Sequence, residues 1–277
     1  MLLDIQELNL TVPTATGPRR ILRGTALHVE SGETVGLVGE SGSGKSTTVR
    51  AALQLVPDRA EISGSITVCG TEVSAGNPSG VLEVRRRKAA MIFQDPRSSL
   101  NPVRRIGDSA TERLVQVHGV GRSEARARLG DLFVEVGLGE PQKLMRRYPH
   151  QLSGGMLQRV VIAAALSTNP ELLLADEATS ALDVTTQAEV LAVLRRLRSE
   201  RQMGVLFITH DLLLAAAYCD RVYVMKDGAI VDEQPGATVF VDPQNPYTKA
   251  LAEATPRLPT GDKRQVAIPT PAKGMAR

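Results

Sequence analysis

The sequence lacks the features that mark membrane-spanning and secreted chains. It contains no run of about 18 apolar residues, and its first residues, MLLDIQELNL, lack a basic start followed by an apolar stretch. The two cysteines, Cys69 and Cys219, lie far apart and have no His or Cys at ligand spacing. We therefore expect a chain that is neither secreted nor membrane-spanning, suits a reducing compartment and carries no cysteine metal site.

Aromatic residues are scarce as well, at 3% of the chain, and tryptophan is absent. A platform on which nucleic-acid bases stack is therefore not expected. The net charge of +3 does not indicate a nucleic-acid partner either, because residues 256–277 alone hold five basic side chains against one acidic side chain. This segment is rich in Pro, Lys and Arg, and we expect it to be a flexible C-terminal tail.

What the chain does have is an apolar content of 42% over 277 residues, enough for one large core or a core plus a smaller lobe. Its first third combines β patterns with one helical pattern. The expected elements are strands at 2–12, 21–30 and 34–38, a helix at 45–55, a third edge strand at 65–69, and a loop near 74–80.

The pattern becomes helical from about residue 95. Leu129, Leu132, Phe133 and Val136 follow the i, i+3, i+4, i+7 spacing of an amphipathic helix, and we place a helical lobe at roughly 95–155. Beyond it strand and helix patterns alternate, which predicts a parallel sheet. The expected elements are an apolar helix at 157–166, strands at 172–175 and 205–209, a helix at 186–201, and an Asp-Gly hairpin of strands at 222–226 and 229–232.

A phosphate-binding loop pattern stands between the strand at 34–38 and the helix that follows it. Its glycines let the backbone curl so that N–H groups and the helix dipole face a polyphosphate. Lys45 is expected to reach the β- and γ-phosphates, and Ser46 to offer an oxygen to Mg²⁺. A plain Gly/Ser linker would not need the flanking strand and helix. The loop consists of Gly39, Glu40, Ser41, Gly42, Ser43, Gly44, Lys45 and Ser46.

Two adjacent carboxylates, Asp176 and Glu177, follow the apolar run at 172–175. Such a pair is also found in solvated turns, and alone it would not decide between a turn and a site. Ligands of parallel sheets gather at the carboxyl edge, where these residues stand. Given the phosphate loop upstream, we expect Asp176 to hold the Mg²⁺ shell and Glu177 to orient or deprotonate the attacking water.

The segment Leu152-Ser153-Gly154-Gly155-Met156 precedes the apolar helix at 157–166. Ser153 suits a helix N-cap, and the two glycines leave amides open to an anion. Spacing alone favours a cap and nothing more. A second interpretation comes from the other motifs with which this segment occurs.

Six motifs in order between residues 39 and 210 strongly resemble those of the ATP-binding-cassette (ABC) ATPases. They are the phosphate loop, Gln94 within Ile-Phe-Gln-Asp-Pro, LSGGM, LLLADE, Ser180-Ala181-Leu182-Asp183, and His210 after a strand. The resemblance implies an α/β fold with a P-loop NTPase (RecA-like) core, an antiparallel β subdomain and an inserted helical subdomain. It implies a nucleotide-binding domain at 1–255, with the helical subdomain at about 95–155.

The resemblance also implies ATP and Mg²⁺ as cofactors and a role for each site residue. Glu177 would be the catalytic base, His210 would steady the γ-phosphate, and Gln94 would sense the metal and the attacking water. The residues implied to bind the phosphates or Mg²⁺ are the phosphate loop with Lys45, Ser46 and Thr47, together with Gln94 and Asp176.

A second ATPase subunit is implied because two such domains pair head to tail in this family. ATP then lies between the phosphate loop of one domain and the LSGGM-type segment of the other. In this chain Ser153, Gly154 and Gly155 would serve the partner's ATP, and Asp183 would link the two sites. The partner would be a related but different subunit, or a second copy of this chain.

Finer features resemble the dipeptide, oligopeptide and nickel importer branch of the family. The resemblance implies permease partners, an indirect link to a solute-binding protein, and a peripheral position on the cytoplasmic face of the cell membrane. A peptide exporter and a soluble ABC ATPase acting on nucleic acid or ribosomes are the alternatives. The segments that carry the resemblance are Gln94–Pro96, Ser98–Pro102, Tyr148–Gln151, Ala181–Thr185 and Asn245–Leu251.

Two departures from the family pattern stand out. An aromatic residue near the turn before the phosphate loop usually stacks on adenine, whereas this chain has none before Phe93. Thr16 or Arg19 stands in that neighbourhood. Many members of the branch also end in a cysteine cluster thought to bind iron and sulfur, but no cysteine follows Cys219.

Overall fold

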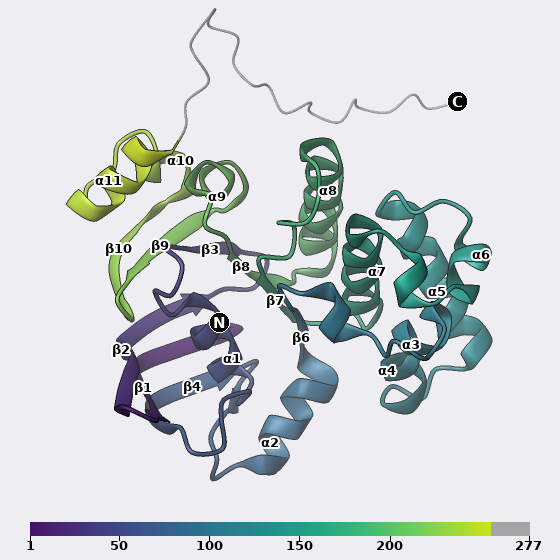
Figure 1. Ribbon diagram of the computed structural model, residues 1–277, viewed down its shortest axis with the longest axis horizontal. Coiled ribbons are helices and arrows are strands. Elements are labelled where there is room, and N and C mark those ends of the chain that lie inside the picture. The colour runs from purple at the N-terminus through teal and green to yellow at the C-terminus, as the bar shows by residue number, and fades with distance from the viewer. Residues whose placement is uncertain (256–277) are drawn as a thin grey trace, which may run out of the picture.

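Residues 1–255 are described by the computed structural model, in which two β-sheets and a group of helices lie side by side (Figure 1). Residues 256–277, for which we expected a flexible tail, lie outside the described residues. The fold is the mixed α/β arrangement expected from the sequence, with a parallel central sheet, an antiparallel sheet and a helical region.

The central sheet has six strands in the order β10-β9-β3-β8-β7-β6. All neighbours pair in parallel except β9 and β10, which form the expected hairpin around Asp227-Gly228. Strands β3, β7 and β8 are buried along their whole length, as their uninterrupted apolar runs predict. The bounds are β3 Thr34–Val38, β6 Ala89–Ile92, β7 Leu172–Asp176, β8 Gly204–Ile208, β9 Arg221–Lys226 and β10 Ala229–Pro235.

The antiparallel sheet has the order β2-β1-β4-β5, with β1 Leu3–Thr14, β2 Gly17–Val29, β4 Glu61–Val68 and β5 Thr71–Glu72. The strand predicted at 65–69 corresponds to the second half of β4, but the prediction that it lies at a sheet edge was wrong, because β4 lies between β1 and β5. Cys69 and Gly70 both have positive φ angles, of 47° and 73°. This tight turn returns the chain for two paired residues and gives β4 a second neighbour.

The segment between β6 and β7 is helical, and its helices lie together on the right of Figure 1. Leu129 and Phe133 on α5 are fully buried, as their spacing predicts. The elements are the 3₁₀ turns η2 Pro96–Ser99 and η3 Pro149–Gln151, and the helices α3 Ile106–Ala110, α4 Glu112–Gln116, α5 Arg122–Glu135, α6 Pro141–Arg146 and α7 Gly154–Ser167.

The loop predicted near 74–80 was wrong in its second half. Helix α2, Pro78–Glu83, begins there and continues into the π-helical turn η1, Val84–Lys88. The Asn77 side chain accepts a hydrogen bond from the Gly80 N–H at 3.1 Å, and Pro78 occupies the first helical turn. The Gly, Pro and Ser content of this stretch predicted a loop. An N-cap residue followed by Pro, however, is a typical start of a helix.

The remaining helices flank the central strands. They are α1 Lys45–Ala52, α8 Val184–Arg201, α9 Leu212–Tyr218, α10 Gly236–Val239 and α11 Pro246–Ala254. Alternate residues of β7 enter different cores: Leu172 and Leu174 face the antiparallel sheet and α1, while Leu173 and Ala175 face α5, α7 and α8. Among residues 1–255, none of the helices has both the length and the apolar character that crossing a membrane requires.

Candidate functional site

The phosphate loop joins β3 to α1, as predicted, and its backbone needs glycine at two points. Gly39 has φ of 152°, and a Cβ there would lie 2.1 Å from the Met225 carbonyl oxygen. Gly44 has φ of 111° and sits against Leu22 and Met225. These contacts with β2 and β9 hold the loop tightly against the two strands beside it.

Lys45 is buried within the loop, with only 5% of its surface exposed. Its ammonium group donates hydrogen bonds to the Gly39 and Glu40 carbonyl oxygens, both at 2.8 Å. Burial lowers the pKa of Lys45, while the neighbouring carboxylates Glu177 and Asp176 act in the opposite direction. A buried cation bonded only to neutral carbonyls is well placed to exchange them for an anion.

Asp176, at the end of β7, accepts a hydrogen bond from the Ser46 hydroxyl at 2.7 Å through Oδ1. The residue is fully buried, and its Oδ2 has no hydrogen-bond partner within the described residues. Burial raises the pKa of this carboxyl. A hydroxyl and an unpaired carboxylate oxygen side by side fit the all-oxygen ligand set of Mg²⁺.

The residues that follow the carboxyl ends of β6, β7 and β8 meet at the Glu177 side chain. Gln94, two residues after β6, donates from Nε2 to Glu177 Oε2 at 2.7 Å. His210, two residues after β8, has Nδ1 3.4 Å from Glu177 Oε1. Glu177 itself adopts φ of 48°, an uncommon angle for a residue other than glycine. The structure thus brings together the three residues that the sequence singled out as catalytic.

Within the described residues, no hydrogen bond joins Ser153, Gly154 or Gly155 to this cluster. The Ser153 hydroxyl accepts from the Met156 N–H at 3.2 Å and caps α7, as the simpler interpretation predicts. Asp183 caps α8 in the same way, accepting from the Thr186 N–H at 3.0 Å, and this bond lowers its pKa. Within residues 1–255, no hydrogen bond joins these residues to the phosphate loop.

Gln158 makes a hydrogen bond that we did not predict. It is fully buried on α7, and its Nε2 donates to the Ala178 carbonyl oxygen at 2.6 Å. Ala178 directly follows Glu177, so this bond links the helix that begins at LSGGM to the segment that follows β7. The available signal was the single side-chain amide in a largely apolar helix, because such an amide must find a partner when it is buried.

The decisive comparison is with a family model described as "ABC transporter", which matches residues 22–180, more than half of the chain. The chain belongs to the ABC transporter family. The resemblance drawn from the motifs is confirmed, and with it the assignment of an ATP-binding, ATP-hydrolysing transporter subunit.

Individual ABC relatives agree with this assignment. The oligopeptide transport ATP-binding protein OppD of Bacillus subtilis is 40% identical over 97% of this chain and 76% of its own length. The probable D,D-dipeptide transport ATP-binding protein DdpD of Escherichia coli is 41% identical over 92% of this chain and 78% of its own length. These names confirm the resemblance to the dipeptide and oligopeptide branch of the ABC family.

The ABC fold is confirmed by a solved structure. The ATP-binding cassette MJ0796, described as a dimeric post-hydrolysis state bound to ADP and Pi, superposes with a TM-score of 0.76 at 28% identity. The match covers 84% of this chain and 98% of MJ0796. The central and antiparallel sheets together with the helices therefore form an ABC cassette.

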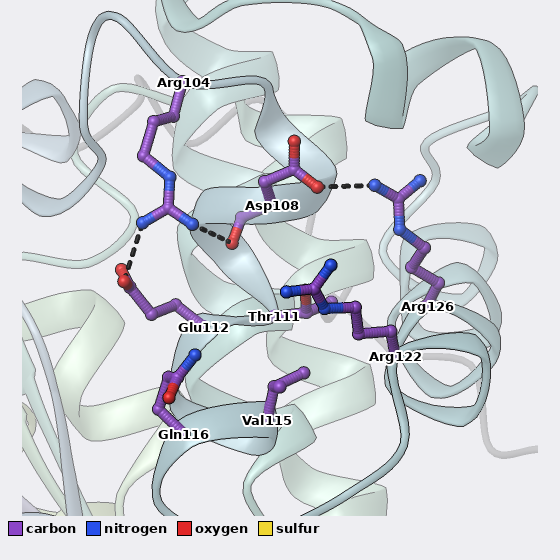
Figure 2. Close-up of a pocket in the computed structure, with 8 residues that line it drawn as sticks. All are labelled: Arg104, Asp108, Thr111, Glu112, Val115, Gln116, Arg122 and Arg126. Carbon is purple, nitrogen blue, oxygen red and sulfur yellow. Dashed lines mark hydrogen bonds and ion pairs between the residues drawn. The ribbon is translucent and has the colours of Figure 1, made fainter.

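Among residues 1–255, two surface hollows differ in whether they adjoin the phosphate loop. One, of about 410 Å³, lies between the β1–β2 turn, Gly42 of the phosphate loop and Asp227 of the β9–β10 turn. The other, of about 250 Å³, lies in the helical region and is shown in Figure 2. Its arginines are largely engaged: Arg104 pairs with Glu112 at 2.6 Å and Arg126 with Asp108 at 2.5 Å. Only the first hollow adjoins the phosphate loop.

Proposed function

We propose that this chain is the ATP-hydrolysing subunit of an importer for peptides or a related small solute such as a nickel chelate. The observation that carries the proposal is the cluster at one sheet edge, where the phosphate loop, the Ser46–Asp176 pair and the Gln94–Glu177–His210 group meet. The oligopeptide and dipeptide transport relatives supply the class of cargo.

ATP phosphates are held by the phosphate loop, Gly39 to Ser46, with Thr47 beside it. Lys45 releases the two loop carbonyls and donates to the phosphates, a charge-assisted bond that is stronger than those it replaces. The residues that would hold Mg²⁺ are Ser46, Gln94 and Asp176. The ion would neutralise negative charge on the phosphoryl group that is transferred.

Hydrolysis depends on Glu177, whose carboxylate orients the attacking water and accepts its proton. Gln94 and His210 fix that carboxylate from two sides, which limits its freedom before the nucleotide arrives. In the loaded site His210 turns to the γ-phosphate, since 66% of its side-chain surface is exposed and it can move. Proton acceptance by a held carboxylate is general-base catalysis.

A second cassette completes each site. Ser153, Gly154 and Gly155 are at least partly exposed at the start of α7, and a helix N-terminus of this kind presents N–H groups to an anion. They serve the ATP on the partner's phosphate loop, and Asp183 connects the two sites. The dimeric state described for MJ0796 supports this arrangement. The partner is a related subunit or a second copy.

Transport requires permease subunits, which the helical region contacts at the cytoplasmic face of the membrane, with a solute-binding protein acting on the other side. Gln94 lies where the chain leaves β6 for this region, and Pro96 follows within two residues. When Gln94 exchanges Glu177 for the nucleotide, residues 95–155 rotate about that joint and pull on the permease.

Peptide-stimulated ATPase activity tests this proposal. In membranes reconstituted with the permease subunits, Gln94→Ala is expected to keep Mg-ATP affinity but to lose most of the stimulation of hydrolysis by peptide. Gln244→Ala, which changes an exposed glutamine between α10 and α11 and outside the helical region, serves as the matched control and keeps full stimulation. Undiminished stimulation in Gln94→Ala would contradict the coupling route.

A further inference from the structure

The last described helix, α11, is fixed at its first residues to the hairpin of β9 and β10 (Figure 1). The Asn245 side chain caps this helix by accepting from the Tyr247 N–H at 2.8 Å, and it donates to the Val231 carbonyl oxygen at 2.7 Å. Thr248 is fully buried, and its hydroxyl donates to the Asp232 carboxylate at 2.6 Å. The start of α11 is therefore held to β10 on both sides of Tyr247.

The Tyr247 ring contacts the end of strand β9. The Lys226 ammonium group lies 4.7 Å from the centre of the ring, within the range of a cation–π interaction. Lys226 is the last residue of β9, and Gly228, two residues later, donates its N–H to the Ser43 carbonyl oxygen at 2.9 Å. The ring therefore rests on the strand end that supports the phosphate loop.

The hydroxyl end of Tyr247 reaches the phosphate loop itself. Burial raises the pKa of Tyr247, the Glu40 backbone lowers it and the Glu40 carboxylate raises it, which places Glu40 beside the hydroxyl. The hydroxyl oxygen is buried and yet has no hydrogen-bond partner within the described residues. Tyr247 thus meets Glu40 through proximity rather than through a well-formed hydrogen bond.

The Glu40 carbonyl oxygen is one of the two that hold Lys45 before the nucleotide arrives. The Lys45 ammonium group donates to it and to the Gly39 carbonyl oxygen, both at 2.8 Å. Once phosphates take over this ammonium group, the peptide units of Gly39 and Glu40 lose these two bonds. A ring held beside Glu40 limits how far this half of the loop can then move.

We propose that Tyr247 is a positioning residue for nucleotide binding, whose ring keeps the Gly39–Glu40 half of the phosphate loop in place. The inference rests on the proposed function, because it takes the phosphates of ATP to be the ligand of the loop. A loop that is already held loses less conformational entropy when its ligand arrives, so its affinity is higher. Since the hydroxyl makes no hydrogen bond, the ring carries this effect.

Equilibrium binding of Mg-ATP and of Mg-tripolyphosphate to the purified chain tests this role. Tyr247→Ala is expected to weaken both by about tenfold, because the ligand must then order the loop. Tyr247→Phe keeps the ring and is expected to bind both as the wild type does. In the assembled complex, Tyr247→Ala should raise the KM for ATP and leave kcat near wild type, since the Gln94, Glu177 and His210 side chains are unchanged.

A matched control separates this role from a general loosening of α11. Leu251 lies one helical turn after Tyr247 and, like Tyr247, is partly buried against the core of the central sheet. Leu251→Ala is expected to lower the thermal stability of the chain while leaving its affinities for ATP and tripolyphosphate unchanged.

Four results would overturn the assignment. Unchanged ATP affinity in Tyr247→Ala would mean that the ring does not support the loop, and a loss for ATP alone would mean that it acts on the nucleoside. An equal loss in Tyr247→Phe would assign the effect to the hydroxyl, and an equal loss in Leu251→Ala would reduce it to the stability of α11. In each case ATP binding by the wild-type chain leaves the proposed function standing, whereas failure of the wild-type chain to bind either probe removes both.

Discussion

Glu177→Gln is expected to reduce ATP turnover by about two orders of magnitude or more while Mg-ATP binding stays largely intact. The substitution removes the proposed proton acceptor but keeps the size of the side chain. An amide oxygen at this position still accepts the hydrogen bond that Gln94 now donates to Oε2 at 2.7 Å. The measurement is single-turnover hydrolysis in the assembled complex, with nucleotide affinity determined in parallel.

Strand β7 offers a matched control for this experiment. Glu171 immediately precedes the strand, at the end opposite Glu177, and is exposed. Glu171→Gln makes the same chemical change and is expected to leave both turnover and affinity near wild type. Full turnover by Glu177→Gln would remove this residue from the mechanism and leave the proton without a known acceptor.

Lys45→Ala is expected to weaken Mg-ATP binding by about ten- to a hundredfold, since a charge-assisted hydrogen bond to a buried phosphate contributes about 1.5–3 kcal/mol. Lys45 is the buried cation of the loop, and its current partners are only backbone carbonyls. Titration calorimetry with the isolated chain measures the loss directly. The effect falls on binding, in contrast to that of Glu177→Gln.

A control must separate lost binding from lost folding. Lys88→Ala also removes a lysine bonded to a backbone carbonyl, that of Cys69, but at the antiparallel sheet. It is expected to keep ATP affinity, and thermal unfolding of both variants reports their stability. Wild-type ATP affinity in a folded Lys45→Ala variant would show that the loop binds phosphate through its backbone alone.

The sequence predicted the elements whose local patterns are unambiguous. Strands β3, β7 and β8 are wholly buried and appear as continuous apolar runs, and the phosphate loop needs its own residues in a fixed order. Helix α2 and the position of β4 in its sheet were not predicted from the sequence. The helix begins at the Asn77 cap within a stretch whose composition suggests a loop. The position of β4 depends on the turn at Cys69-Gly70, whose positive φ angles are seen only in the structure.

In the candidate site too, the sequence predicted which residues take part but not how they are placed in space. Motif order identified Gln94, Glu177 and His210, yet Gln94 and Glu177 are separated by 83 residues. Their contact results from the parallel pairing of β6 with β7, which places the carboxyl ends of two strands side by side although the whole helical region separates them along the chain. The hollow beside the phosphate loop likewise requires the β1–β2 turn to lie beside Gly42, a relation set by tertiary packing through Gly228. Local patterns carry no information about such distances.

The central claim is that ATP hydrolysis by this chain drives peptide movement across a membrane. It is tested most directly by uptake of labelled peptide into vesicles that hold the permease, both ATPase subunits and the solute-binding protein, with Mg-ATP supplied on the side of the ATPases. Peptide should accumulate with the wild-type chain and fall to background with Glu177→Gln in this chain together with the corresponding substitution in the partner ATPase subunit, or with ADP in place of ATP. Accumulation at the wild-type rate under either condition would contradict the account.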